Sequence, residues 1–250
     1  MNVLRTPDAA FANIGFDFEA EYLCVEAQDG TELRMHYIDE GEKSGPVVLC
    51  LHGQPSWSYL YRKMVAPLTA AGLRVIAPDL IGFGKSDKPT ETDAHSYGGH
   101  VDWMVQFIEQ LNLSGINGLF QDWGGLIGMR VVERMPERFA RVVAANTMLL
   151  DTADIPDETA QALEAAYNSM PVPSAEDIKS GFDNDDPLAG AMWVKYVTEN
   201  PAFNVRDVFK VITGVDDESA LAGYAAPFPD DSFLAGPRAL PLLFPIFTHH

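Results

Sequence analysis

The fold is decided by the stretch Leu119-Phe-Gln-Asp-Trp-Gly-Gly125, an apolar run that ends in an acid followed by two glycines. An apolar run that leads through glycines into an amphipathic segment indicates strand, tight turn and helix. The turn carries Asp122, and an aspartate at its ordinary pKa is ionised at neutral pH. Such a carboxylate can act as a nucleophile without a base to remove a proton first. The alternative role is a helix N-cap, which accepts hydrogen bonds from free backbone N–H groups.

The flanking glycines favour the nucleophile. Gly124 and Gly125 permit a sharp strand-to-helix turn, the arrangement of a nucleophile elbow with Asp in place of Ser. The start of the helix behind it favours an anion. A second loop, His52-Gly-Gln-Pro55, also follows an apolar run. The backbone N–H groups of Gln54 and Trp123 can together form an oxyanion hole, and we interpret His52 as structural.

Strand and helix patterns alternate along the first part of the chain and predict an α/β fold with a mostly parallel sheet flanked by helices. A hairpin is predicted over 21–27 and 33–38. Further strands are predicted over 46–51, 73–78, 116–121 and 141–146, and helices over 59–71, 101–111 and 125–135. Ligands bind beyond the carboxyl ends of strands in such sheets, and His52, Asp79 and Asp122 all fall at such ends.

The composition changes after Asp151, where the chain becomes rich in Ala, Asp and Glu and is punctuated by prolines. We therefore predict a main domain over 1–151, a helical cap over 152–223 and a return to the main domain over 224–250. An insertion that follows a strand end can lie over the strand ends as a lid.

The charge balance excludes several partners. The chain carries 17 basic and 36 acidic residues, a net charge of −19 that repels nucleic acid. No signal peptide is evident and no apolar run approaches the ~20 residues that span a bilayer, so a soluble cytoplasmic protein without a membrane partner is expected.

Cys24 and Cys50 are interpreted as buried free thiols, and the Cys and His spacing indicates no metal site. Gly82-Phe-Gly-Lys-Ser86 lacks the glycines of a P-loop or a dinucleotide fingerprint.

Together these segments resemble the haloalkane dehalogenases of the α/β-hydrolase fold, in the subfamily that holds halide with one Trp beside the nucleophile and another in the cap. Asp-Trp-Gly-Gly alone also occurs in epoxide hydrolases, whereas the whole set is specific and spans nearly the whole chain. The resembling segments are Leu4-Arg-Thr-Pro-Asp8, Leu33-Arg-Met-His-Tyr37, His52-Gly-Gln-Pro-Ser-Trp-Ser-Tyr-Leu-Tyr-Arg62, Pro78-Asp-Leu-Ile-Gly-Phe-Gly-Lys-Ser-Asp-Lys-Pro89, Gln121-Asp-Trp-Gly-Gly125 and Tyr224-Ala-Ala-Pro-Phe-Pro-Asp230.

The resemblance implies a role for each matching residue. Asp122 is the implied nucleophile, and the indole N–H groups of Trp123 and Trp193 are the implied halide donors. The backbone N–H groups of Gln54 and Trp123 are the implied oxyanion hole, although this subfamily usually has Glu where this chain has Gln54. The implied pocket-lining positions are Leu240 and Pro241.

The implied enzyme is a cofactor-free hydrolase of carbon–halogen bonds, and its partners are a short haloalkane, halide and water. Asp122 displaces halide from an sp³ carbon in an SN2 step and forms an alkyl-enzyme ester. Two indole N–H donors stabilise the halide where water is excluded. Hydrolysis of the ester then needs a His base that an acid orients.

The triad acid and His are not identifiable in this chain. The order in this fold is nucleophile, acid, His, and only His249 and His250 follow Asp122. We interpret these two as linker or tag residues, or as sequence that continues natively; the preceding histidines His36, His95 and His100 break the order. Asn146 stands where a sister subfamily places its acid, but the resemblance implies an acid after the next strand.

We therefore expect that the last strands and helices of the family domain are absent from this chain. The strand that ends at 146 would then expose an apolar edge, which is an aggregation hazard. Either a complementing C-terminal segment or second chain completes the fold, or the sequence is incomplete.

Two other functions remain open. An epoxide hydrolase of the same fold would need acids to protonate the ring oxygen, and the candidates are Tyr167, Tyr196 and Tyr224. A binding protein or inactive fragment is the second alternative, because no catalytic His is identified.

Overall fold

A six-stranded sheet forms the centre of the protein in a computed structural model, which describes residues 1–148 and 157–244. The strand order is β2-β3-β5-β4-β7-β8, and three of the five pairings are parallel. A separate two-stranded sheet joins β1 to β6. The strands are β1 Val3–Leu4, β2 Glu21–Glu26, β3 Glu32–Glu40, β4 Val47–Leu51, β5 Arg74–Pro78, β6 Lys88–Pro89, β7 Ile116–Gln121 and β8 Phe139–Ala145. The predicted α/β fold with a mostly parallel sheet is confirmed.

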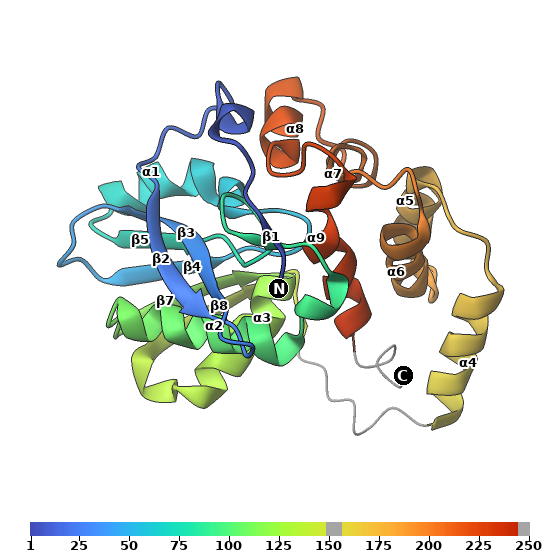
Figure 1. The fold of residues 1–250 in the computed structure, drawn as a ribbon, viewed down its shortest axis with the longest axis horizontal. Helices are drawn as coiled ribbons and strands as arrows, with labels where there is room; N and C mark the ends of the chain where they lie inside the picture. The colour runs from blue at the N-terminus through green and yellow to red at the C-terminus, as the bar shows by residue number, and fades with distance from the viewer. Residues whose placement is uncertain (149–156, 245–250) are drawn as a thin grey trace.

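Helices cover both faces of the sheet, with α1 on one face and α2 and α3 on the other (Figure 1). The helices are α1 Arg62–Ala70, α2 Tyr97–Gln110, α3 Trp123–Arg134, α4 Asp157–Ser169, α5 Ala175–Asp183, α6 Ala189–Glu199, α7 Val205–Asp207, α8 Glu218–Ala225 and α9 Ala235–Ala239. Short 3-10 turns are η1 Asp8–Phe11, η2 Ser58–Tyr61, η3 Thr92–Ala94, η4 Pro136–Arg138, η7 Asp231–Phe233 and η8 Leu240–Leu243, and η6 Val208–Ile212 is a π-helical turn.

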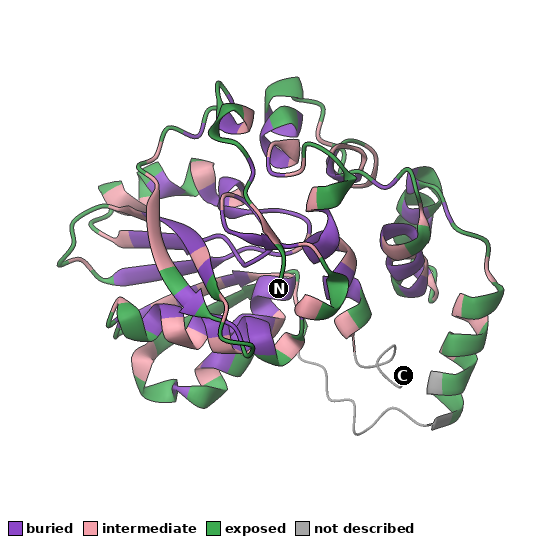
Figure 2. Cartoon of the chain, in the orientation of Figure 1, coloured by how far each residue is buried: buried purple, intermediate pink, exposed green. Residues whose placement is uncertain are grey.

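The alternation of side chains along β4 divides the core into two layers. Val47, Leu49 and Leu51 pack toward α2 and α3, whereas Val48 and Cys50 pack toward α1. All five are buried, as Figure 2 shows for the central strands as a whole. Because full burial of such a side chain contributes about 1.5–3 kcal/mol, this strand is a major support of the loop that follows it.

The three predicted helices differ from the observed ones at their ends, and the helix predicted over 101–111 is α2, which starts at Tyr97 and ends at Gln110. The segment predicted as a helix from 59 begins as the 3-10 turn η2, and α1 starts at Arg62. The backbone N–H of Ser58 donates to the Asp79 carboxylate at 2.8 Å, which fixes the start of η2 by a tertiary contact. The helix predicted from 125 starts at Trp123, directly after the strand.

Residues 157–225 form the helices α4 to α8 and the π-helical turn η6, joined by short irregular segments. The predicted boundary between 151 and 152 lies outside the described residues. Most of α4 is exposed, whereas α5 and α6 pack on each other (Figures 1 and 2). The cap lies at one end of the sheet, and α9 lies between the sheet and α6.

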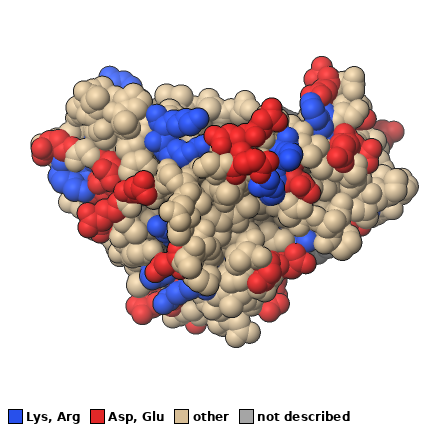
Figure 3. Space-filling model, turned by 90° about the horizontal axis from the view of Figure 1, so that it is seen from above, with Lys and Arg blue, Asp and Glu red and all other residues tan. Residues whose placement is uncertain are grey.

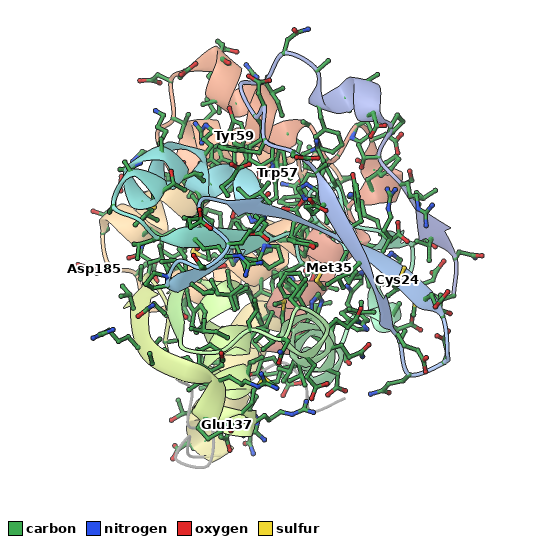
Figure 4. The ribbon with its side chains drawn as sticks, turned by 90° about the vertical axis from the view of Figure 1, so that its left-hand side faces the viewer. Cys24, Met35, Trp57, Tyr59, Glu137 and Asp185 are labelled. Atoms are coloured by element: carbon green, nitrogen blue, oxygen red, sulfur yellow. The ribbon has the colours of Figure 1, made fainter. Side chains whose placement is uncertain are left out.

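The two cysteines differ in burial, and the prediction that both are buried was wrong for Cys24. Cys24 lies on the outer strand β2 and is exposed, at the edge seen in Figure 4. β2 is the outermost strand on its side of the sheet and pairs only with β3. Cys50 lies in the central strand β4, where burial raises the pKa of its thiol to about 12. Both are free thiols.

Lys and Arg lie beside Asp and Glu on the surface shown in Figure 3, so opposite charges are interspersed there. Within residues 1–148 and 157–244, no helix is long and apolar enough to cross a membrane. The same residues contain no cluster of three or more His, Cys, Asp or Glu suited to a metal ion.

Candidate active site

Asp122 sits at the turn between β7 and α3 in a conformation that aims its side chain away from the helix. Its φ is +53°, in the left-handed region that L residues seldom adopt. The carboxylate makes no capping bond to α3. Instead, Oδ1 accepts the backbone N–H of Gln54 at 2.8 Å. The carboxylate is therefore held mainly by the loop that follows β4.

Glycines make this turn possible, because side chains would collide at each close approach. A Cβ at Gly124 would lie 2.2 Å from the Leu51 carbonyl oxygen, and one at Gly53 would lie 2.3 Å from Oδ1 of Asp122. A Cβ at Gly125 would lie 2.1 Å from Oγ1 of Thr147. The loop after β4 and the turn after β7 thus touch each other, as the parallel pairing of these strands requires.

The end of β8 holds the turn from its other side. The N–H of Asp122 donates to the Asn146 carbonyl at 3.1 Å, and the Thr147 hydroxyl donates to the Asp122 carbonyl at 2.8 Å. Asn146 is itself exposed and has a φ of +44°. Sequence reasoning missed Thr147, although its position just past a strand end was the available signal.

The environment of Asp122 acts on its charge in two opposite ways. Removal from bulk water raises the pKa of the carboxyl, while the backbone N–H groups of Trp123 and Gln54 favour the charged form. An ionised carboxylate with few hydrogen bonds is a stronger nucleophile than a solvated one, because it carries less water to be displaced.

The carboxylate faces a cavity of about 490 Å³ between the main domain and the cap, which is within the usual range for small-molecule sites. Pro241 lines it, as expected. Leu240 does not, because it is fully buried in the core cluster that includes residues of α2 and α3. The lining is mostly apolar and comprises Gln54, Pro55, Ser56, Leu60, Gln121, Asp122, Trp123, Met148, Leu163, Phe182, Pro187, Gly190, Ala191, Trp193, Val194, Val208, Phe209, Ile212, Thr213, Pro241 and Phe244.

Both tryptophans implied by the resemblance line this cavity with Asp122. Trp123 begins α3 and is 5% exposed, and Trp193 projects from α6 in the cap. Neither indole nitrogen has a hydrogen-bond acceptor within the described part of the chain. In contrast, the indole of Trp57 donates to the Gly223 carbonyl at 2.9 Å. Two N–H donors are therefore free to meet a ligand in an apolar cavity.

His52 and Asp79, which also follow strand ends, lie behind the cavity. The His52 ring donates from Nδ1 to the Gly53 carbonyl and accepts the Leu80 N–H at Nε2, both at 2.9 Å. Burial lowers the pKa of His52. With both nitrogens occupied by backbone, His52 holds the loop that carries Gln54, consistent with the structural role expected for it.

The glycine-containing run after Asp79 binds an internal carboxylate. A Cβ at Gly84 would lie 2.0 Å from Asp79 Oδ2, and that oxygen accepts the Lys85 N–H at 2.8 Å and His36 Nδ1 at 2.7 Å. Burial opposes the charge of Asp79, but His36, His52 and the Lys85 N–H outweigh it and lower its pKa to about 2. The glycine-containing run thus encloses a carboxylate that the same chain supplies.

No histidine or tyrosine lines the cavity among residues 1–148 and 157–244. His95 and His100 form a buried stacked pair away from it, with Nδ1 and Nε2 3.3 Å apart. The Tyr224 ring stacks on Phe209 with a centroid separation of 3.7 Å, and Tyr196 is buried in the cap core. His249 and His250 lie outside the described residues.

Comparison with known proteins agrees with this geometry. The alpha/beta hydrolase fold family matches residues 46–171. A haloalkane dehalogenase of Psychrobacter cryohalolentis is 44% identical over 247 residues, which are 98% of this chain and 72% of that protein. The solved haloalkane dehalogenase DpaA of Paraglaciecola agarilytica NO2 is 33% identical over 98% of this chain and 73% of its own, with a TM-score of 0.70. An epoxide hydrolase of Vigna radiata, 23% identical over 90% of this chain and 72% of its own, shares the fold with a TM-score of 0.60. The chain belongs to the haloalkane dehalogenase family, within the alpha/beta hydrolase fold.

Proposed function

We propose that this chain cleaves carbon–halogen bonds of short haloalkanes without a cofactor, with Asp122 as the nucleophile. The observation that carries the proposal is the shared cavity, in which one carboxylate oxygen bonded to Gln54 N–H faces two indoles without acceptors. A carboxylate oxygen attacks the carbon in line with the departing halide, the carbon–oxygen bond forms and the electron pair of the carbon–halogen bond leaves with the halide. The Trp123 and Trp193 N–H groups donate to that halide.

The alkyl-enzyme ester is then hydrolysed by a water that attacks the ester carbonyl. The backbone N–H groups of Gln54 and Trp123 are suited to stabilise the oxyanion that forms, since both act on the Asp122 carboxylate. This step needs a base, and no described histidine lines the cavity. The base therefore belongs to residues outside those described or to a complementing segment, and the exposed edge of β8, with Val143 57% exposed, offers a place for such a segment.

Incubation with 1-bromobutane and measurement of intact protein mass tests the first step. We expect the 250-residue chain to gain the mass of one butyl group and to release one equivalent of bromide, with an adduct that persists. An Asp122→Asn control should gain nothing. Continuous bromide release over many turnovers by the chain alone would instead place the base among its own residues.

An epoxide hydrolase would need acids beside the nucleophile, and the three tyrosines named above are absent from the described cavity lining. Tyr167 donates to the Glu199 carboxylate at 2.8 Å, and Tyr224 stacks on Phe209. We therefore expect no reaction of Asp122 with 1,2-epoxybutane under conditions that alkylate it with 1-bromobutane. A chain that reacts with neither would support the alternative of a binding protein or inactive fragment.

The cap over 152–223 is proposed to close the cavity over the strand ends. Residues of 163–213, on α4, α5, α6, η6 and the turns beside them, form about half of the lining. Their apolar side chains exclude water from the halide that leaves, which strengthens the indole hydrogen bonds.

A further inference from the structure

The short helix α9 joins the two halves of the cavity through two adjacent residues. The side-chain Nε2 of Gln54 donates to the Pro237 carbonyl at 2.9 Å. The backbone N–H of the same Gln54 donates to Asp122 Oδ1 at 2.8 Å. The loop that contacts the carboxylate is therefore fastened to the backbone of α9.

The next residue fastens α9 to the cap. Arg238 Nη1 donates to the Val197 carbonyl at 2.7 Å and to the Thr198 carbonyl at 3.3 Å. Both of its terminal nitrogens also reach the Asn200 carbonyl, at 3.4 and 3.3 Å. These carbonyls form the C-terminal end of α6, where free carbonyl groups and the negative end of the helix dipole favour a cation.

α6 is the helix that carries Trp193. Among the hydrogen bonds of the described residues, those from Arg238 are the ones that tie α6 to a residue outside 157–223. The guanidinium also lies 5.2 Å from the Phe203 ring centroid, so its plane packs on the segment that follows α6. The position of Trp193 relative to the main domain thus depends on the hydrogen bonds of the Arg238 guanidinium as well as on apolar packing.

α9 itself is fixed to the main domain. Gly236 approaches the loop after β5 so closely that a Cβ there would lie 3.0 Å from the Gly82 Cα. Ala235, Gly236 and Pro237 are buried. Because α9 is packed this tightly, it cannot easily shift relative to the main domain, so a residue on α9 can fix the position of the cap relative to the main domain.

We propose that Arg238 is a positioning residue that sets the distance between Trp193 and Asp122, and thereby the affinity of the site for halide. The inference rests on the proposed function, since it assigns Trp193 to the halide. The Gln54 amide supports the same geometry from the opposite side, because only an N–H donor can bond to the Pro237 carbonyl and a glutamate there has none.

Bromide binding, followed by quenching of tryptophan fluorescence, tests this role. In Arg238→Met the bromide dissociation constant should rise about fivefold to tenfold, the effect of a loosened coupling residue. In Arg238→Lys the bromide dissociation constant should lie between those of the wild type and Arg238→Met. An ammonium keeps the positive charge but lacks the planar guanidinium that reaches three carbonyls. The matched control is Arg206→Met, an exposed cap arginine paired with Glu218, and it should change the constant by less than about twofold.

A double-mutant cycle separates positioning from general destabilisation. In a Trp193→Phe background the Arg238→Met change should have almost no further effect on bromide binding, because the donor that it positions is gone. An equal loss in both backgrounds, or an Arg238→Met protein that binds bromide like the wild type, would overturn the inference. If Arg238→Met does not fold, Arg238→Lys replaces it in the cycle, and its loss of bromide affinity is compared with and without Trp193→Phe.

The wild type distinguishes this inference from the proposed function. Failure of the unchanged chain to bind bromide and to be alkylated at Asp122 would reject the proposed function itself. Normal alkylation and bromide binding in the wild type, with no effect of either Arg238 variant, would reject only the role of Arg238.

Discussion

The two walls of the cavity are built in different ways. The main-domain wall is fixed by backbone, with Asp122 bonded to Gln54, Asn146 and Thr147 and with glycines at each close approach. The cap wall consists mostly of apolar side chains, and some of them, such as Phe182 at 48%, are substantially exposed. The difference indicates that the reacting group is held rigidly while the surface that meets the alkyl chain can adapt.

The largest effect should come from a methyl group on the main-domain wall. In Gly124→Ala the Cβ would lie 2.2 Å from the Leu51 carbonyl and 2.5 Å from the His52 carbonyl, both backbone atoms. We expect a loss of about 3–5 kcal/mol in the free energy of unfolding, or no soluble protein. The cap control is Gly190→Ala on α6, where nothing lies within 4 Å. The free energy of unfolding of Gly190→Ala, measured in urea, should rise by about 0.5–1 kcal/mol. A similar change in the free energy of unfolding for both variants would contradict the difference between the two walls.

The next effect concerns the two halide donors, one on each wall. Trp193→Phe and Trp123→Phe each remove one N–H donor, and a hydrogen bond to a charged group is worth about 1.5–3 kcal/mol, or roughly a tenfold to hundredfold loss of bromide affinity. The thermal midpoint should fall more for Trp123, which is 5% exposed, than for the half-buried Trp193. Unchanged bromide affinity in either variant would show that the indole replaced in it does not bind the halide.

Acid should weaken the main domain before the cap. His95 and His100 are buried, and burial lowers the pKa of His95 to about 4 and that of His100 well below its ordinary value. The unfolded chain takes up protons near pH 6.5 while the folded chain does not, so stability is complete above pH 6.5 and declines as the pH falls toward 4. At pH 5.5 the loss should be about 1 kcal/mol for each histidine.

Urea unfolding at pH 7.0 and 5.5 measures this loss, and hydrogen exchange locates it. Residues 157–223 contain no histidine, so protection there should change less than in α2. A double variant with Phe at both positions should lose most of the pH dependence between 7.0 and 5.5. An unchanged slope in that variant would show that other groups cause it.

The smallest effect is expected on the outer part of the cap wall. Leu163 lines the cavity from the mostly exposed helix α4. Leu163→Ala should change the free energy of unfolding by less than about 1 kcal/mol, as for other partly exposed positions. The rates of alkylation by 1-bromobutane and 1-bromohexane report on its contact with substrate, and their ratio should shift by about twofold toward the longer chain. A large loss of stability would show that this wall is as tightly packed as the other.

The sequence allowed the strands and the turn around Asp122 to be predicted because local patterns determine them. The run from Ile116 to Gln121 was predicted with its observed bounds, and the pairing of β4 with β7 brings Gln54 to the Asp122 carboxylate. Apolar runs, glycines and strand ends are all visible in one stretch of sequence.

The tertiary supports of the site could not be predicted in the same way. Arg238 reaches the end of a helix about 40 residues earlier, and Thr147 binds a carbonyl rather than a side chain. Leu240 and Pro241 are adjacent, yet only Pro241 lines the cavity. Such contacts depend on the direction of single side chains in short turns, which no sequence period specifies.

The most direct test of the account is to locate the alkyl group after reaction with 1-bromobutane. Proteolysis and tandem mass spectrometry of the reacted chain should find one butyl ester, on Asp122, and none in the Asp122→Asn protein. A butyl group on another residue, or an unmodified Asp122 in a chain that binds bromide normally, would contradict the assignment of Asp122 as the nucleophile.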